Sequence, residues 1–324
     1  MLSTLYAAAA RRRREHYAAR PDLRRRLRHP VISIGNLAVG GRGKTPLAAT
    51  VARLLRDGGE RPAILSRGYG RARQEEGVVV VRDRDGIRAD LARSGDEPLM
   101  LARQLPGVCV LTCPDRYLSG RFAEHHLSAT VHILDDGFQH LQLERDIDLL
   151  IVGGDDVRNP VTLPAGRLRE PLDAIVAADA ILTADEDVAV DTGGLDLPVY
   201  RLRRRTPLRA PDEAGAIIAV AGIAAPARFF DDLRAAGWHI AEALTFPDHH
   251  RYTARDVDRM TAAARGHDAV RIMTTEKDYV RLLPFRPFAV PVQQVPLVLE
   301  PDPIDRFRDW LAMEVAAVRG DIRG

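Results

Sequence analysis

The sequence predicts an α/β fold, a P-loop NTPase-type parallel sheet with a second, smaller α/β lobe. Short β-branched runs alternate with helical stretches, which is typical of a parallel sheet. A Gly-rich turn follows the first of these runs, and a charged stretch with two prolines separates two alternating regions. With 324 residues, 46% apolar and 28% charged, the chain can form one large or two medium folded domains.

The first alternating region is expected to contain most of the strands. We predict strands near 31–35, 62–66, 108–112, 130–134, 147–152 and 179–183. Helices are predicted near 45–57, 96–104 and 115–126, and a loop rich in Gly, Pro and Asp near 153–170. Residues 31–205 are therefore predicted to form the larger, P-loop core.

The second region follows the charged stretch 201–213, which is interpreted as a connection between lobes. Strands are predicted near 216–221 and 269–274, and helices near 225–236, 254–265 and 303–318. The last of these helices is amphipathic and could pack on either lobe. Residues 206–324 are assigned to the smaller lobe, and a cleft between two lobes is a usual place for a two-substrate site.

Residues 1–30 form a basic N-terminal segment. Nine Arg against Glu15 and Asp22 give it about +7 of charge, in a chain whose net charge is only +2. Apolar and aromatic side chains interleave with this charge, which suits helices lying on an anionic membrane surface: Leu2, Leu5, Tyr6, Tyr17, Leu23 and Leu27. A solvated tail or a nucleic-acid patch is the alternative, although aromatic residues at 5% argue against a nucleic-acid-binding module.

The rest of the composition points to the cytosol. Cys109 and Cys113 have neither the number nor the spacing of a zinc site or a disulfide framework, so reduced thiols are expected. No apolar run approaches the roughly 20 residues that span a bilayer, and the arginines follow the first apolar stretch rather than precede it. No segment indicates an obligate protein partner.

Lysine is rare in this chain. Of 47 basic residues, only Lys44 and Lys277 are lysines. A chain that uses Arg almost everywhere should keep Lys where a compact ammonium is needed and a planar guanidinium does not fit. Both are therefore functional candidates, with chance retention as the alternative.

The strongest motif is the Gly-rich turn after the first strand, GNLAVGGRGKTP. A strand, such a turn and a helix together put backbone N–H groups and a helix N-terminus against phosphate oxygens. Lys44 would reach the β- and γ-phosphates, and Thr45 would hold Mg²⁺. The first Gly of the usual pattern is replaced by Ala38. The predicted nucleotide-binding residues are Ala38, Val39, Gly40, Gly41, Arg42, Gly43, Lys44 and Thr45.

Paired carboxylates end the strand predicted near 130–134. In a P-loop protein an acid at this strand end binds Mg²⁺ directly or through water, so Asp135 is the predicted metal ligand beside Thr45. Asp136 lies next to it, and repulsion between neighbouring carboxylates favours a cation close by. A plain Asp-Gly turn is the alternative.

A set of motifs follows in a fixed order along residues 31–280: GNLAVGGRGKTP, LSRGYG, SGDEP, PDR, LDDGFQHLQLERDIDL, LPAGRLREP, FPDHHRY and TTEKD. In this order the motifs resemble the tetraacyldisaccharide 4′-kinase family of lipid A biosynthesis. The resemblance implies ATP-dependent, Mg²⁺-dependent phosphorylation of the 4′-hydroxyl of a tetraacyldisaccharide 1-phosphate, giving lipid IVA, by a P-loop kinase core. It also implies a peripheral enzyme on the cytoplasmic face of the inner membrane, a surface rich in anionic lipid.

Further site residues follow from this resemblance. Asp96, at a predicted helix start, is expected to act in catalysis, although a helix cap is the alternative. His249, rather than His250, is expected to assist it across a closing cleft. The remaining predicted catalytic residues match PDR, DDGFQH and LREP, and they are Arg116, His140, Arg169 and Glu170, together with Lys44, Asp135 and Asp136.

Two alternatives stay open. In TTEKD, Glu276 or Lys277 could hydrogen-bond the adenosine, or the pair could form an interlobe salt bridge. The rival function is a P-loop NTPase switch or metallochaperone-type protein that acts on a protein partner; Val39 argues against the partitioning subclass, some of whose members carry lysine before the double glycine.

Overall fold

The structure is a computed structural model, and it describes residues 1–73, 75–184, 190–192, 194–211 and 215–323. The chain divides into two compact units. The larger comprises Met1–Arg203 and Leu299–Gly324, and the smaller comprises Arg204–Val298. This division differs from the predicted one, in which residues 206–324 formed the smaller lobe. The difference arises because the chain returns after residue 298 to add a strand and a long helix to the larger unit.

The sheet of the larger unit has the strand order β13-β8-β7-β6-β1-β5-β2-β4-β3. Its strands are β1 (Val31–Asn36), β2 (Pro62–Ser66), β3 (Val79–Arg82), β4 (Cys109–Thr112), β5 (Val131–Asp135), β6 (Ile147–Val152), β7 (Ala180–Thr183), β8 (Val199–Arg205) and β13 (Val298–Asp302). The pairs from β4 through β2, β5, β1, β6 and β7 to β8 are parallel, and β3 is antiparallel to β4. The predicted parallel sheet is confirmed.

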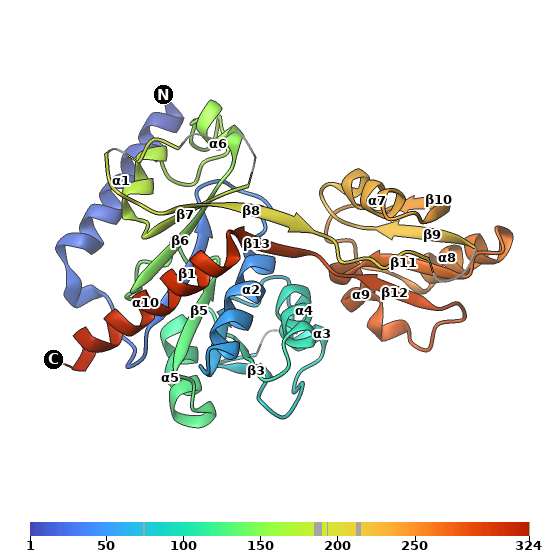
Figure 1. The fold of residues 1–324 in the computed structure, drawn as a ribbon, viewed down its shortest axis with the longest axis horizontal. Helices are drawn as coiled ribbons and strands as arrows, with labels where there is room; N and C mark the ends of the chain where they lie inside the picture. The colour runs from blue at the N-terminus through green and yellow to red at the C-terminus, as the bar shows by residue number, and fades with distance from the viewer. Residues whose placement is uncertain (74, 185–189, 193, 212–214, 324) are drawn as a thin grey trace. The chain divides into compact units, whose positions relative to one another are not determined.

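The central strands are apolar because helices and loops cover both faces of the sheet. Every residue of β1, β5 and β6 is buried, which is the pattern of parallel strands packed on two sides. The helices are α1 (Leu2–Ala19), α2 (Lys44–Asp57), α3 (Leu91–Ser94), α4 (Asp96–Gln104), α5 (Arg116–Leu127), α6 (Gly154–Arg158) and α10 (Ile304–Arg323), with 3₁₀ turns η1 (Pro21–Leu23) and η2 (Leu172–Ala177). Figure 1 shows α2 alongside β1 and β5, which it contacts.

The connection predicted at 201–213 begins inside a strand. Along β8, Tyr200 and Leu202 are buried, whereas Arg201, Arg203 and Arg205 are exposed. Phe307 of α10 packs edge-on against Tyr200 at 5.1 Å between ring centroids. The apolar face of β8 is therefore covered by the C-terminal helix, which is why a charge-rich stretch forms a strand.

The smaller unit has a parallel sheet of order β10-β9-β11-β12. Its elements are β9 (Ala216–Ala221), α7 (Pro226–Ala235), β10 (His239–Thr245), α8 (Ala254–Gly266), β11 (Arg271–Thr275), α9 (Glu276–Leu282), η3 (Leu283–Phe285) and β12 (Val292–Val295). Thr253 and Asp256 cap α8 reciprocally, and Thr275 caps α9. Two apolar clusters cover the two faces of this sheet, one around Phe229 and Trp238 and one around Phe246 and Tyr252.

Candidate active site

The Gly-rich turn joins β1 to α2 as predicted. Gly43 is the N-cap of α2 at φ +83°, and Gly40 lies at φ +107°. Other residues adopt such angles only at a cost, so the glycines let the loop bend tightly before the helix. The free N–H groups of the first turn and the helix dipole make this end of α2 suited to a phosphate group.

The turn is held from the side by the segment that precedes LREP. Val39 N–H donates to the Arg167 carbonyl at 2.8 Å, and Arg167 Nη2 donates to the Val39 carbonyl at 3.1 Å. Arg42 Nη2 binds Asp156 Oδ1 of α6 at 2.7 Å, and the Asp156 side chain is only 2% exposed. The guanidinium of Arg42 therefore fixes the loop to α6. The backbone N–H of Arg42, and not its side chain, remains suited to nucleotide.

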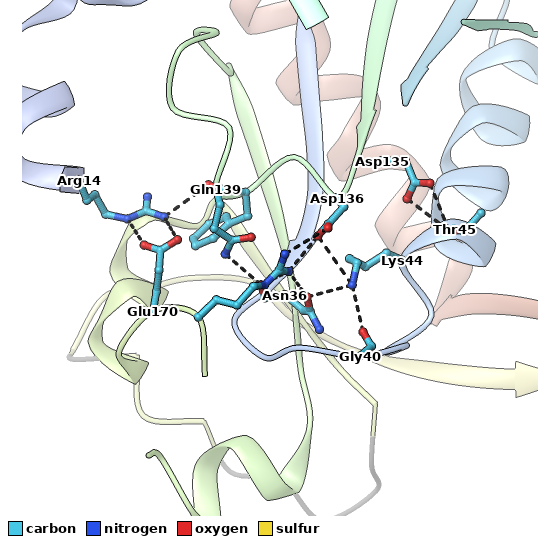
Figure 2. A network of polar contacts seen from close by, with 11 residues as sticks. Arg14, Asn36, Gly40, Lys44, Thr45, Asp135, Asp136, Gln139 and Glu170 are labelled. Carbon is cyan, nitrogen blue, oxygen red and sulfur yellow. Dashed lines mark hydrogen bonds and ion pairs between the residues drawn. The ribbon is translucent and has the colours of Figure 1, made fainter. Parts of the chain in front are cut away.

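Lys44 lies among oxygen atoms at the loop. Its Nζ donates to Asn36 Oδ1 at 3.1 Å and to the Gly40 carbonyl at 3.2 Å, and it lies 3.7 Å from Asp136 Oδ1 (Figure 2). A side chain that binds the loop's own carbonyl can exchange that contact for phosphate oxygens without moving its backbone. The position therefore agrees with the role predicted for the P-loop lysine.

Asp135 and Thr45 face each other across the end of β5 and the start of α2. The two carboxylate oxygens of Asp135 lie 3.1 and 3.4 Å from Thr45 Oγ1 (Figure 2). Burial, followed by the charges of Glu97 and Asp136, raises the pKa of Asp135 to about 7 against the lowering effect of Lys44. A hydroxyl and a carboxylate are hard oxygen donors that fit Mg²⁺, and a cation beside them would favour the ionised carboxylate.

Asp136 is held in an ionised state beside this pair. Arg169 donates to its two oxygens at 2.8 and 3.1 Å, and also to Asn36 Oδ1 at 2.6 Å. Although burial would raise the pKa of Asp136, the hydrogen bonds from Arg169 and the charge of Lys44 lower it. The backbone of Asp136 is left-handed at φ +57°, a strained conformation for a residue with a Cβ.

Arg116 and His140 are buried, and Arg116 interacts electrostatically with Asp135 and Asp136. Arg116 is 1% exposed, and burial, followed by the charge of Arg67, lowers its pKa to about 10. Burial, followed by the charges of Arg116 and Arg67, lowers the pKa of His140 to about 4, so the imidazole is neutral at pH 7. The buried charge of Arg116 therefore offsets the charge of Asp135 and Asp136.

Asp96 and Glu97 form the acidic first turn of α4. Asp96 Oδ1 accepts from the Glu97 backbone N–H at 3.1 Å, and the helix dipole stabilises both carboxylates at this end. The charge of Glu97 contributes to the raised pKa of Asp135 at the end of β5. Asp96 therefore lies at a helix start, as predicted.

Glu170 lies on the other side of the site and is bound by the N-terminal helix. Arg14 Nε and Nη2 donate to its carboxylate at 2.7 and 3.0 Å (Figure 2). The Glu170 side chain is only 7% exposed. Residue 170 is therefore a buried carboxylate whose partner comes from α1.

The remaining predicted residues belong to the smaller unit. His249 Nε2 lies 3.1 Å from Lys277 Nζ, and its Nδ1 lies 3.3 Å from Arg281 Nη2. His250 instead binds Asp256 at 3.1 Å and stacks on Phe246, so its contacts serve the start of α8. Glu276 is buried, and its carboxylate accepts from the Leu297 N–H at 3.2 Å.

Several residues of this constellation carry no signal strong enough to select them from the sequence. Asn36 is a buried strand residue that meets Lys44 and Arg169, and Gln139 Nε2 donates to its carbonyl at 3.1 Å. Asp156 and Arg14 act through partners more than 100 residues away. Arg67 and Glu97 lie within family motifs, LSRGYG and SGDEP, and these motifs were the only signal that could have selected them.

Comparisons with known proteins agree with this geometry. The family model for tetraacyldisaccharide-1-P 4′-kinase matches residues 1–315. A tetraacyldisaccharide 4′-kinase of Geobacter sulfurreducens is 39% identical over 94% of this chain and 88% of its own length. One of Anaeromyxobacter dehalogenans is 42% identical over 79% of this chain and 73% of its own length.

A solved structure is similar over nearly the whole chain. The crystal structure of LpxK from Aquifex aeolicus in complex with ATP matches with a TM-score of 0.80 and 30% identity, and 97% of each chain is covered. As for membrane segments, none of the helices within the described residues combines the length and the apolar character needed to cross a bilayer.

Proposed function

The chain belongs to the tetraacyldisaccharide-1-P 4′-kinase family, and we propose that it transfers the γ-phosphoryl group of ATP to the 4′-hydroxyl of a tetraacyldisaccharide 1-phosphate, giving lipid IVA. One observation carries this proposal. Lys44, Thr45, Asp135, Asp136 and Arg169 meet at the carboxyl ends of β1 and β5, beside the N-terminus of α2. This is the arrangement that phosphoryl transfer requires, with cations and N–H groups around the phosphates and carboxylates beside them.

Nucleotide binding is assigned to the turn and to α2. The backbone N–H groups of residues 40–45 and the dipole of α2 would bind the phosphates, and Lys44 Nζ would stabilise charge on the β- and γ-phosphates. Thr45 and Asp135 would hold Mg²⁺, which would neutralise charge on the transferring group. Glu276 and Lys277 remain the predicted contacts of the adenosine.

The acceptor hydroxyl needs a proton acceptor because it is a weak nucleophile at neutral pH. We assign this role to Asp96: as the new P–O bond forms and the bond to the β-phosphate oxygen breaks, the hydroxyl proton passes to the Asp96 carboxylate. His249 is the predicted assistant of Asp96, and the two residues belong to different units. ADP and the 4′-phosphorylated acceptor are the products.

The positive charges of Arg116, Arg67 and Arg169 would stabilise the negative charge at the site during transfer. Each lies where it offsets charge that the carboxylates and the γ-phosphoryl group concentrate at one edge of the sheet. His140, neutral at pH 7 because its pKa is about 4, can donate or accept a hydrogen bond there without adding charge.

The proposed place of action is the cytoplasmic face of the inner membrane, where an acylated acceptor resides. Leu2 and Leu5 of α1 are 70% and 64% exposed, and several arginines share that helix. Such a helix suits attachment to anionic lipid. If it attaches there, Leu2→Ser with Leu5→Ser should lower co-sedimentation with vesicles containing phosphatidylglycerol, and equal co-sedimentation would refute attachment through α1.

The test of the function is to incubate the purified protein with ATP, Mg²⁺ and detergent-solubilised disaccharide 1-phosphate. Phosphate on the lipid and total released phosphate are then measured together. Transfer that matches ATP consumption supports the proposal. Hydrolysis without transfer would instead favour the rival function, a nucleotide-driven switch or metallochaperone-type protein that acts on a protein partner.

A further inference from the structure

The N-terminal helix is tied to the polar network of the site. Arg14 donates to both carboxylate oxygens of Glu170, and its guanidinium carbon lies 4.4 Å from the ring centroid of Phe138. The Arg14 side chain is 18% exposed and that of Glu170 7% exposed. An ion pair this sheltered and this geometrically complete is expected to hold its two segments in one arrangement.

The segments that Arg14 holds are those that position the carboxylates. Phe138 follows the Asp135-Asp136-Gly137 turn, and Glu170 follows Arg169, which binds Asp136. Neighbouring contacts on α1 reinforce the tie: Arg13 Nη1 donates to the Gln139 carbonyl at 3.2 Å, and Arg11 pairs with Asp173 at 2.7 Å.

The network is continuous from α1 to the P-loop lysine. Gln139 and Arg169 both donate to the Asn36 carbonyl at 3.1 Å, and Asn36 Oδ1 accepts from Lys44 (Figure 2). Groups linked in this way polarise and orient one another, so removing one end leaves the others less well placed. Without Arg14, Glu170 would be a buried carboxylate deprived of its cation, which favours movement of residues 168–171.

We propose that Arg14 is a positioning residue: by holding Glu170 and Phe138 it sets the placement of Arg169 and Asp136, so that the transfer site is complete only when α1 is docked. The inference rests on the proposed function and adds to it a role for α1 that does not require a membrane. Attachment of α1 to lipid alone would predict that all exposed arginines of the helix matter alike. Positioning predicts that Arg14 alone among matched arginines matters when the acceptor is presented in detergent.

The kinetic test compares Arg14→Ala with Arg12→Ala, an exposed arginine on the same helix that loses the same charge. With detergent-solubilised acceptor, Arg14→Ala should lower kcat/KM for the acceptor about tenfold to a hundredfold, because displacements of about 1 Å at a site have effects of that size. Arg12→Ala should stay within about twofold. Arg14→Lys, which keeps the charge but loses the planar fork, should fall between the two. The KM for ATP should change little in all three.

Two further measurements separate positioning from a general loss of structure. In a Glu170→Gln background, Arg14→Ala should cost about threefold or less, because residues that act as a unit are not additive. Hydrogen–deuterium exchange should be faster in residues 134–141 and 167–171 of Arg14→Ala, and unchanged in α2. The exchange measurement needs no acceptor, so it tests whether Arg14 holds these segments even if the wild-type protein transfers no phosphate. Absence of transfer would refute the proposed function alone.

Equal losses in Arg14→Ala and Arg12→Ala would overturn the inference, as would a loss that multiplies fully with that of Glu170→Gln. Unchanged exchange in residues 134–141 and 167–171 of Arg14→Ala would overturn it as well.

Discussion

The sheet of the larger unit has an amino edge, where the parallel strands begin, and a carboxyl edge, where they end. Each of these edges contains an arginine that binds a carboxylate through two hydrogen bonds. At the amino ends of β2 and β5, Arg319 of α10 donates to Glu60 at 2.7 and 2.6 Å. At the carboxyl ends of β1 and β5, Arg169 donates to Asp136 at 2.8 and 3.1 Å. The pairs are chemically alike, but their surroundings differ.

At the amino edge, the carboxylate and guanidinium of the Glu60–Arg319 pair find further hydrogen-bond partners within the protein. Glu60 also accepts from Thr130 Oγ1 at 2.6 Å, and Arg319 Nη2 donates to the Thr130 carbonyl at 3.1 Å. This pair joins the C-terminal helix to two strands, which is a stabilising role.

At the carboxyl edge, several buried polar groups find no hydrogen-bond partner among the residues that the structure describes. Within the described part of the chain, Asn36 Nδ2, Gln139 Oε1, His140 Nε2 and Arg169 Nε are buried without a hydrogen-bond partner. Asp136 has a strained backbone at φ +57°, and burial raises the pKa of Asp135 to about 7. Buried polar groups are normally paired, and although others among the described residues, such as His132 Nδ1, also lack a partner, these four surround one strained aspartate, which suits a site shaped for a ligand. Substitutions at the two edges should therefore have opposite effects.

The largest effect is expected for Asp96. If its carboxylate accepts the proton, Asp96→Ala should lower kcat about 10²- to 10⁴-fold and change the KM for ATP little. His249→Ala should act in the same direction, and the double variant should lose much less than the product of the single losses. Steady-state kinetics of the three variants decide this. A loss confined to the KM for ATP would assign Asp96 to nucleotide binding.

A loss of roughly 10²- to 10³-fold in transfer is expected for Lys44→Ala, because one donor to developing charge is removed. Lys44→Arg should also be poor, since the guanidinium is larger and differently shaped. The thermal unfolding midpoint should stay close to that of the wild type in both variants. Near-normal turnover of Lys44→Arg would contradict the assignment of a point charge to this position.

The carboxyl edge should also cost stability in acid. His140 has a folded-state pKa of about 4 against an ordinary value of 6.5, because burial and the charges of Arg116 and Arg67 oppose protonation. Between these values the unfolded chain binds a proton that the folded chain does not, so stability falls as pH falls from about 6.5 to 4. The loss is on the order of 2–3 kcal/mol.

His140→Gln should therefore flatten this part of the pH profile in urea unfolding experiments, and replacing the exposed His126 by Gln should leave it unchanged. An unaltered slope in His140→Gln would show that the acid sensitivity arises elsewhere.

The amino edge should contribute stability at neutral pH, and this contribution should also be lost in acid. Although burial would raise the pKa of Glu60, hydrogen bonds from Arg319 and Thr130 lower it below 4.5. The stabilisation is thus present above pH 4.5 and is lost as pH falls through the lowered pKa. At pH 7, Arg319→Ala should lower the free energy of unfolding by about 1–2 kcal/mol, and the difference should fade in acid. Transfer activity well below that of the wild type would break the comparison.

The difference between the edges also explains what the sequence could predict. The ends of β1 and β5 were located because apolar runs lead into GGRGKT and DDG, and such transitions are local. Asn36 and Gln139 were not selected, because their roles depend on pairings between strands and turns. Arg14 was counted only as part of a basic segment, because its partner lies 156 residues away.

The same reason accounts for the missed elements. β8 contains five charged or exposed positions around Tyr200 and Leu202, and its pairing with β7 and packing under α10 depend on distant residues. The short elements β3, α3, α6, α9, β10, β12 and β13 were likewise not predicted, since few residues carry each periodic pattern. α10 itself was predicted as a helix, but its pattern does not say which unit covers its apolar face.

The most direct test measures unfolding free energy and phosphate transfer on the same preparations of Asp136→Asn and Glu60→Gln. Both variants remove one charge from an arginine pair and keep the shape of the side chain. We predict that Asp136→Asn loses transfer by about 10²-fold or more while its stability is unchanged or higher. Glu60→Gln should lose about 1 kcal/mol of stability and keep transfer within about twofold. If Asp136→Asn is destabilised as much as Glu60→Gln and still transfers phosphate, the carboxyl edge is not the catalytic one.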